Sequence, residues 1–357
     1  MTYSGTGVDT TKVADETRAL ARILAQTAAF RRGIGESVLD NGYYASALRI
    51  TDDLALGICT DGVGSKLLVA ERMGKFDTVG IDCIAMNVND LVCIGAEPIA
   101  LLDYIAVERL QPGVMAEIAK GLHEGAKQSR IVIPGGETAQ LPEMIKGSKP
   151  GHGLDLVGMA VGIAPLPRIN SGAGVEPGDV VIGLASSGVH SNGFTLARRA
   201  LFQGGGFDID THRPELGRTV GEELLEPTRI YVREAMDLFA EVEVRALCHI
   251  TGDGLGNLTR VAAKVGWVLD TLPEPLPVFR LIAEAGKVDP AEMYTVFNMG
   301  IGMCVVVRPE EVDAACAVAL RHGAKPAVIG RATGENPGTV SLPKQRLRGS
   351  GTAFAPV

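Results

Sequence analysis

Residues 60–66 combine glycines with one acidic and one basic side chain in a pattern suited to binding phosphate. The segment reads TDGVGSK and joins an expected strand to an expected helix. Glycines let successive backbone N–H groups point into one concavity, and the following helix N-terminus adds positive potential. Lysine supplies a point charge, and aspartate is a ligand that Mg²⁺ accepts. The alternative is a tight turn with an N-capping aspartate. The candidate nucleotide-binding residues here are Asp61, Gly62, Val63, Gly64, Ser65 and Lys66.

Polar residues interrupt an apolar helix that the pattern predicts over residues 81–94. Asp82, Met86 and Asp90 are spaced four apart and therefore share one stripe of this helix. Asn87 and Asn89 add amides to the same helix, and buried polar groups need partners. A bound metal or ligand would satisfy them, and so would hydrogen bonds to neighbouring loops. The sequence leaves both alternatives open.

A third glycine-rich segment, residues 135–139, follows a short expected strand. It reads GGETA, so a carboxylate comes directly after two glycines. The alternative is a helix start, where acidic residues interact favourably with the helix dipole. With the two earlier segments it supplies three carboxylates, and Mg²⁺ that contacts phosphates is typically held by a few such groups. The candidate metal ligands are Asp61, Asp90 and Glu137, and Gly135 and Gly136 are further candidates for nucleotide binding.

A histidine lies in the fourth segment, residues 186–193, which reads SSGVHSNG between an expected strand and an expected helix. A lone histidine is more often structural than catalytic. In a loop of small and polar residues near a helix start, however, it suits phosphate contact or proton transfer. Residues 249–257, HITGDGLGN, have similar chemistry, although a plain connecting loop has the same composition. The candidates in the fourth segment are Gly188, His190, Ser191, Asn192 and Gly193.

Strands and helices must bring these segments together. The pattern predicts strands over 54–60, 100–107, 131–134, 154–163, 180–185 and 303–307, and helices over 15–29, 65–73, 81–94, 115–129, 194–201, 230–240 and 312–322. A Pro- and Gly-rich stretch, 165–177, marks a domain boundary. We therefore expect one domain over 1–166, a second over 167–345 and a loose tail over 346–357. Because strict βαβ order is absent, we predict an α+β fold rather than a doubly wound sheet.

Composition excludes several classes of function. The chain of 357 residues has a formal net charge of −8 and is 4% aromatic, so it lacks the basic face and the stacking surfaces of nucleic-acid-binding proteins. Six cysteines without a CxxC pair indicate reduced thiols in a cytoplasmic enzyme. The N-terminus lacks the pattern of a signal peptide, and no apolar stretch approaches a membrane span.

Taken together, these motifs are similar to those of the AIR synthetase superfamily. The similarity extends in order over almost the whole chain, and residues 70–107 resemble archaeal-type members in particular. Each motif alone is weak, but their joint occurrence is specific. The matching segments are 3–9, 60–66, 80–98, 135–142, 186–196, 225–231, 249–254 and 293–302.

The resemblance implies a two-domain α+β fold and a homodimer in which the N-terminal sheets of two subunits complete a barrel. It implies ATP, Mg²⁺ and a ribonucleotide substrate, with ring closure of formylglycinamidine ribonucleotide to aminoimidazole ribonucleotide as the reaction. By the family's motifs, the three carboxylates would lie on the metal side, Lys66 and the glycine-rich loops would hold phosphates, and His190 and Asn192 would lie against the reacting groups.

Two departures from the family pattern bear on the site. Many bacterial relatives carry a Gly-Gly-Phe-Gly-Ala loop near the N-terminus, where this chain has NGYYA at 41–45. Asp253 also replaces the middle glycine of a Gly-Gly-Gly string, so it either faces away from the site or helps to bind a cation or ribose hydroxyls. Other ATP-using members of the superfamily, and a nucleotide-binding scaffold without catalysis, are the rival functions.

Overall fold

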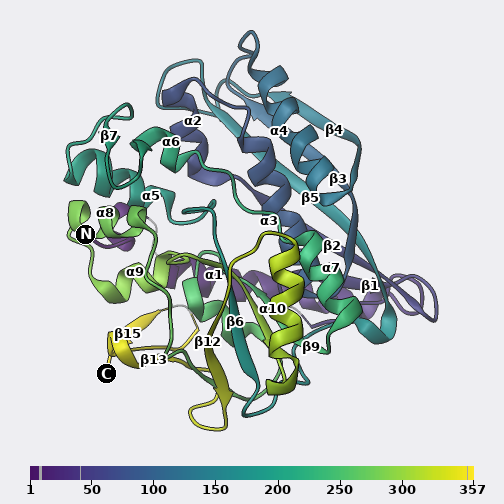
Figure 1. The fold of residues 1–357 in the computed structure, drawn as a ribbon. Helices are drawn as coiled ribbons and strands as arrows, with labels where there is room; N and C mark the ends of the chain where they lie inside the picture. Colours follow the sequence, from purple (N-terminus) through teal and green to yellow (C-terminus); the bar gives the residue numbers. More distant parts are fainter. Residues whose placement is uncertain (8–9, 41, 352) are drawn as a thin grey trace.

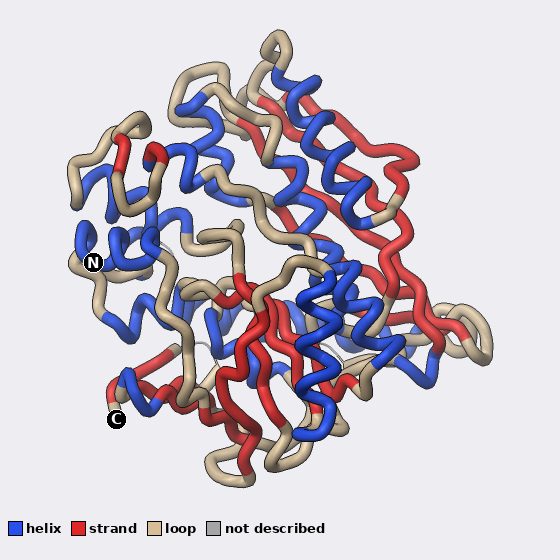
Figure 2. Tube along the Cα trace, in the orientation of Figure 1, coloured by secondary structure: helices blue, strands red, loops and turns tan. Residues whose placement is uncertain are grey.

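The computed structural model describes residues 1–7, 10–40, 42–351 and 353–357, and its strands gather in two main groups (Figures 1 and 2). The 3–9 match and the 41–45 departure therefore fall partly outside the described residues, at positions 8, 9 and 41. In the described part of the chain, no helix has the length and apolar character needed to cross a membrane.

The first sheet has five strands in the order β1-β2-β5-β3-β4. Neighbouring strands are antiparallel except for β3 and β4, which are parallel. The strands are β1 (Ser46–Arg49), β2 (Leu54–Gly62), β3 (Glu97–Val107), β4 (Val132–Gln140) and β5 (Leu154–Pro165). The helices of this half are α1 (Thr10–Ala25), α2 (Leu67–Met73), α3 (Val79–Cys93) and α4 (Val114–Ser129).

Helix α3 is buried on almost every side because it lies between the two halves of the molecule. It packs against β2, β3 and β5 of the first sheet and against β9 of the second. Glycine permits its close approach to α4, since a Cβ on Gly80 would lie 2.2 Å from the backbone nitrogen of Leu122. An all-apolar helix is typically a buried one. Its few polar side chains are thus carried to the boundary between the halves.

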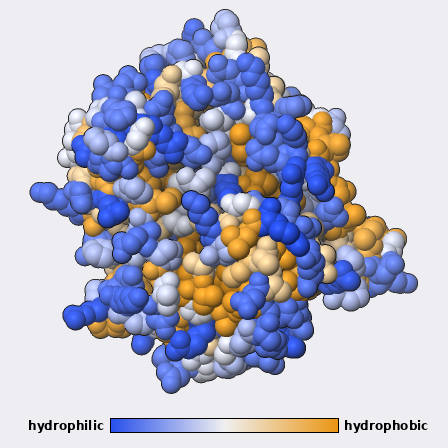
Figure 3. Space-filling model, in the orientation of Figure 1, coloured by the Kyte–Doolittle hydropathy of each residue, from blue (hydrophilic) through white to orange (hydrophobic). Residues whose placement is uncertain are grey.

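The opposite face of the first sheet is apolar and exposed. Leu102, Tyr104 and Met159 are 38–41% exposed there, and Leu102 pairs with Met159 across neighbouring strands. Orange side chains gather along the edge of the molecule where β3 and β4 lie (Figure 3). Contiguous apolar surface is often found where a protein contacts a partner.

The second sheet has eight strands in the order β15-β14-β13-β10-β12-β6-β11-β9. Every residue of β11 is buried, as expected for a continuous apolar run covered on both faces. The strands are β6 (Val180–Ala185), β9 (Val244–His249), β10 (Gly266–Val268), β11 (Ile301–Val307), β12 (Pro326–Thr333), β13 (Val340–Leu342), β14 (Leu347–Gly349) and β15 (Phe354–Pro356), with β7 (His212–Arg213) and β8 (Arg218–Thr219) as a separate pair. The helices are α5 (Phe194–Arg198), α6 (Val220–Leu224), α7 (Val232–Glu241), α8 (Pro277–Gly286), α9 (Pro290–Val296) and α10 (Val312–Arg321).

The mixed helix and strand content confirms the α+β class, and two local predictions are wrong. The segment 346–357 is not a loose tail, because β14 pairs with β13 and β15 pairs with β14. The glycines at 135 and 136 do not form a loop, because β4 runs through them and pairs with β3. Sheet pairing satisfies their backbone groups, and this outweighs the poor strand preference of glycine.

Candidate active site

Asp61 and Asp90 approach each other where the end of β2 meets α3. Burial raises the pKa of Asp61 above its ordinary value, and the negative charge of Asp90 raises this pKa further. The N–H of Gly62 donates to Oδ1 of Asp61 at 2.7 Å. Oδ1 of Asp90 lies 2.8 Å from Nδ1 of His249, whose ring is fully buried. Two carboxylates that repel each other offer oxygen ligands suited to a divalent cation.

Glu137 does not join this pair within one chain. Across the first sheet, Asp61 is in register with Gly136, whereas Gly62 is in register with Glu137. Side chains alternate between the two faces of a sheet, so Glu137 and Asp61 point to opposite faces. Three strand spacings, roughly 14 Å, also separate β4 from β2. Among the described residues no group of three His, Cys, Asp or Glu side chains is placed to hold a metal ion. The predicted three-carboxylate site is therefore not formed by a single described chain.

His190 lies in the fourth segment at the boundary between the two halves. Its φ is +65°, and its side chain is buried. The N–H of Ser187 donates to Nε2 of His190 at 3.2 Å, so the hydrogen of the neutral ring is on Nδ1. Nδ1 is buried and has no hydrogen-bond partner among the described residues. Burial holds the pKa of His190 well below its ordinary value, and electrostatic interactions with His249, Lys66 and Arg229 lower it further. The ring is thus a neutral hydrogen-bond donor.

Lys66 and Asp82 form a buried ion pair within the first half, and both side chains also bind groups of the second half. The ammonium of Lys66 donates to Oδ1 of Asp82 at 2.8 Å and to the backbone oxygens of His190 and Glu226 at 3.1 and 2.6 Å. Both charged side chains have no exposed surface. Burial lowers the pKa of Lys66, and the charge of Asp82 opposes this effect.

The same oxygen of Asp82 accepts three further hydrogen bonds from the second half. The N–H and hydroxyl of Thr228 donate to it at 2.8 and 2.6 Å, and the hydroxyl of Ser191 donates at 3.3 Å. We call Lys66, Asp82, Ser191 and Thr228 the Asp82 network. Lys66 would have to leave three acceptors before its ammonium contacted a phosphate, so its phosphate-binding role stays a prediction.

The predicted nucleotide-binding segment 60–66 is less open than its glycines suggest. The N–H of Val63 donates to the carbonyl oxygen of Leu156 at 3.0 Å, so this amide is used by the sheet and does not face a ligand. Gly64 has a φ of +69° and open space where a Cβ would lie. The turn therefore favours glycine because of its backbone conformation and not because a side chain would clash. The hydroxyl of Ser65 lies 3.1 Å from that of Thr195 and adds a second contact between the halves.

Residues from the fourth and fifth segments meet beside α3. Nδ2 of Asn192 lies 4.0 Å from the sulfur of Met86, and a Cβ on Gly252 would lie 3.3 Å from Oδ1 of Asn192. Of the other candidates, Gly188 accepts hydrogen bonds at its carbonyl oxygen from Ser186 and Asn298. Gly193 has a φ of +78° and lies against Phe297, with a Cβ distance of 2.5 Å that excludes any side chain.

Asp253 has a cationic partner, which bears on the choice that the sequence left open. Oδ2 of Asp253 lies 2.9 Å from Nη2 of Arg260, and the guanidinium of Arg260 is 5.3 Å from the centre of the Tyr44 ring. The hydroxyl of Tyr44 donates to the carbonyl oxygen of Asn257 at 2.8 Å. The charge that Asp253 adds to a proposed anion site is therefore compensated locally.

Sequence reasoning named Asp82 and Asn89 as polar residues of an apolar helix and His249 as part of a glycine-rich segment, but it missed what these three buried residues contact. Asp82 was noted only for its helical spacing, yet it anchors four donors. His249 follows an apolar run but contacts Asp90. Asn89 donates to the backbone oxygen of Arg229 at 2.9 Å and accepts from the N–H of Tyr231. The available signal was the set of polar residues in an apolar helix, whose partners lie more than a hundred residues away.

Comparison with known proteins assigns the family. The description "AIR synthase related protein, N-terminal domain" matches residues 42–164, and "AIR synthase related protein, C-terminal domain" matches residues 176–342. The phosphoribosylformylglycinamidine cyclo-ligase of Methanothermobacter thermautotrophicus is 49% identical over 89% of this chain and 91% of its own length. The chain belongs to the AIR synthase family. The enzyme of the same name from Thermococcus kodakarensis is 47% identical over 90% and 92% of the two chains.

Solved structures support the AIR synthase fold. A thiamine-monophosphate kinase from Stenotrophomonas maltophilia has a TM-score of 0.58 at 19% identity, covering 89% of this chain and 94% of its own. The T. maritima protein PurL, complexed with ADP, has a TM-score of 0.56 at 14% identity, covering 89% and 46%. At these identities the likeness concerns the fold alone. The predicted resemblance to this family, and to archaeal members in particular, is confirmed by the relatives above.

Proposed function

We propose that this chain catalyses the ATP-dependent closure of formylglycinamidine ribonucleotide to aminoimidazole ribonucleotide, with release of ADP and phosphate. The observation that carries the proposal is the match to relatives named phosphoribosylformylglycinamidine cyclo-ligase over nine-tenths of their length. In the reaction, the γ-phosphoryl group of ATP passes to the formyl amide oxygen. The amidine nitrogen then attacks the activated carbon, the five-membered ring closes, and the phosphate leaves.

Asp61 and Asp90 are suited to the metal that such a reaction uses. Burial raises the pKa of Asp61 and the charge of Asp90 raises it further, and a bound divalent cation would stabilise both carboxylates in their charged form. Bound Mg²⁺ would neutralise charge on the phosphate oxygens. His249 contacts Asp90 and orients it toward this position. Glu137 stays a proposed metal-side carboxylate, and it would have to act from the other face of the sheet or from a second chain.

His190 is proposed to stabilise charge that develops during the reaction, and the Asp82 network is proposed to hold His190 in position. Within the described part of the chain the Nδ1–H of His190 is a buried donor without a partner, and such groups are costly unless a ligand satisfies them. We assign it to the developing negative charge on the transferred phosphoryl group or on the amide oxygen. The Asp82 network holds the His190 backbone against α3, so the two halves present their groups to one substrate together. Asn192 is proposed to orient the substrate beside His190.

A homodimer with cytoplasmic location completes the proposal. The exposed apolar face of β3 and β5 supports pairing of two first sheets into a barrel. We also propose a division into domains at residues 166 and 167, because the two sheets lie on either side of that position.

A turnover assay tests the proposal directly. Purified full-length chain with ATP, Mg²⁺ and formylglycinamidine ribonucleotide should form aminoimidazole ribonucleotide and ADP in equal amounts. ADP formation without ring closure would assign the chain another ATP-dependent activity of the family. The comparison variant is His190→Ala, in which product formation should fall while the fold is retained. This result would show that the turnover comes from this site and not from a contaminating enzyme.

A further inference from the structure

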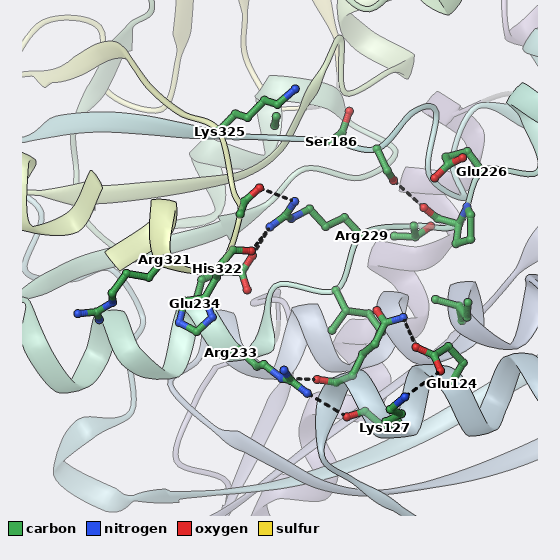
Figure 4. Close-up of a pocket in the computed structure, with 18 of the residues that line it drawn as sticks. Glu124, Lys127, Ser186, Glu226, Arg229, Arg233, Glu234, Arg321, His322 and Lys325 are labelled. Carbon is green, nitrogen blue, oxygen red and sulfur yellow. Dashed lines mark hydrogen bonds and ion pairs between the residues drawn. The ribbon is translucent and has the colours of Figure 1, made fainter. Parts of the chain in front are cut away.

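A basic cleft borders the candidate active site, between α4 of the first half and α7 and α10 of the second (Figure 4). It shares Ser186, Ser187 and Thr228 with that site, but none of its cations is a candidate site residue. Its volume is about 900 Å³, which falls in the range of small-molecule sites. Five cationic side chains line it, and they come from both halves of the chain. They are Lys127, Arg229, Arg233, Arg321 and Lys325.

Acidic side chains compensate this charge only in part. Three carboxylates line the same cleft, which leaves two positive charges in excess in a chain whose net charge is −8. One of the three, Glu226, is paired with Arg218, which does not line the cleft. Arg229 pairs with Glu234 at 3.0 Å and Lys127 with Glu124 at 3.9 Å. Arg321 pairs with Glu241, which does not line the cleft. The local excess of cations therefore runs against the charge of the protein as a whole.

Two of the cations have no carboxylate partner among the described residues. Arg233 donates only to the backbone oxygens of Lys127 and Gln128, at the C-terminal end of α4. Lys325 is exposed at the start of β12, and its ammonium extends into the cleft without a dashed contact in Figure 4. These are donors for an anion rather than members of a closed network of ion pairs.

The lining also indicates which part of a ligand is recognised. Apart from the imidazole of His322, none of the described residues that line the cleft is aromatic, so it offers no platform on which a base could stack. Guanidinium and ammonium groups in a cleft of this kind suit a phosphate dianion. We propose that this cleft is a second ligand site, which binds a small phosphate-bearing anion between the two halves of the chain.

One wall of the cleft is shared with the Asp82 network. The segment 226–230 faces the cleft, and its backbone also holds Lys66 through Glu226, Asp82 through Thr228 and Asn89 through Arg229. Arg233 meanwhile ties α7 to α4 across the halves. Arg233 and Lys325 belong to the second half and Lys127 to the first, so an anion held among these three side chains would bridge the two halves.

Binding of two probes tests the proposal independently of catalysis. Isothermal titration of the full chain with inorganic phosphate, and separately with ribose 5-phosphate, is carried out at constant ionic strength. We expect saturable binding of at least one probe, and tighter binding of ribose 5-phosphate identifies a sugar phosphate rather than free phosphate as the ligand. Lys325→Glu, which removes an exposed cation without a partner, should weaken binding about tenfold or more.

A second variant and a matched control keep the result interpretable. Arg233→Ala should weaken binding in the same direction, whereas Lys344→Ala, an exposed lysine between β13 and β14, should leave it unchanged. Equal affinity in the wild type, Lys325→Glu and Arg233→Ala would place the anion elsewhere and overturn the proposal. No binding of either probe at millimolar concentration would also overturn it. Both outcomes are independent of the turnover assay above.

Discussion

Replacing Lys66 with methionine should destabilise the fold, because it leaves the carboxylate of Asp82 buried without its cation. The two groups are 2.8 Å apart, and neither side chain is exposed. Removing one partner of a buried ion pair costs about 3–5 kcal/mol. Thr228 and Ser191 still donate to Asp82 in the variant, so we expect a loss near the lower end, about 3 kcal/mol.

Urea unfolding of a set of variants measures this loss. Lys66→Met is compared with Asp82→Asn and with the double variant, which removes both charges together. Because the two residues interact directly, the double variant should be less destabilised than the sum of the single ones, by about 1–3 kcal/mol. Lys75→Met is the control, since its pair with Asp77 is exposed and should contribute less than about 1 kcal/mol.

The two roles considered for Lys66 give opposite results. A phosphate-binding lysine would lose activity on substitution with little change in the free energy of unfolding. If Lys66→Met unfolds within about 0.5 kcal/mol of the wild type and its effect adds to that of Asp82→Asn, the Asp82 network does not hold the halves together and the reasoning is refuted.

Three further predictions concern His190, the carboxylates and the dimer. His190 stays neutral in the folded protein, whereas in the unfolded chain it takes up a proton below a pH of about 6.5. Its contribution to the free energy of unfolding should therefore be complete above that pH and fall by up to about 1.4 kcal/mol per pH unit below it. Urea unfolding of His190→Asn at several pH values should show a smaller loss of stability with falling pH than the wild type. Turnover at limiting Mg²⁺ should be abolished by Asp61→Asn and by Asp90→Asn, with an unchanged circular dichroism spectrum. Near-normal turnover of both variants would exclude a shared metal site. The same assay on Glu137→Gln shows whether the third carboxylate takes part. Leu102→Arg should convert a dimer into a monomer in sedimentation experiments, and a wild type that is already a stable monomer at micromolar concentration would contradict the proposed barrel.

Elements with strong local signals could be predicted closely from the sequence. The strand expected over 180–185 is β6 (Val180–Ala185), and the helix expected over 81–94 is α3 (Val79–Cys93). Both have long apolar runs, which depend little on partners elsewhere in the chain. Helix α9 was missed although Asp289 and Pro290 mark its start, with the Asp289 carboxylate accepting from the N–H of Ala291.

Features set by distant pairing could not be predicted. The strand β4 forms through glycines because β3 supplies its partner, and the register of that pair turns Glu137 away from Asp61. The role of Lys66 likewise depends on Asp82 and on a loop more than a hundred residues away. A motif gives the type of group that is available, but sheet register and domain contacts decide which groups meet.

The measurement that tests the central claim most directly is the turnover of formylglycinamidine ribonucleotide by wild type and His190→Ala at saturating ATP. We expect the wild type to form aminoimidazole ribonucleotide and one ADP per ring closed. In His190→Ala, kcat should fall by roughly a hundredfold to ten-thousandfold, with far smaller changes in KM and thermal stability. A wild type that hydrolyses ATP without forming the ring, or a variant with unchanged kcat, would contradict the function and the role that we assign to His190.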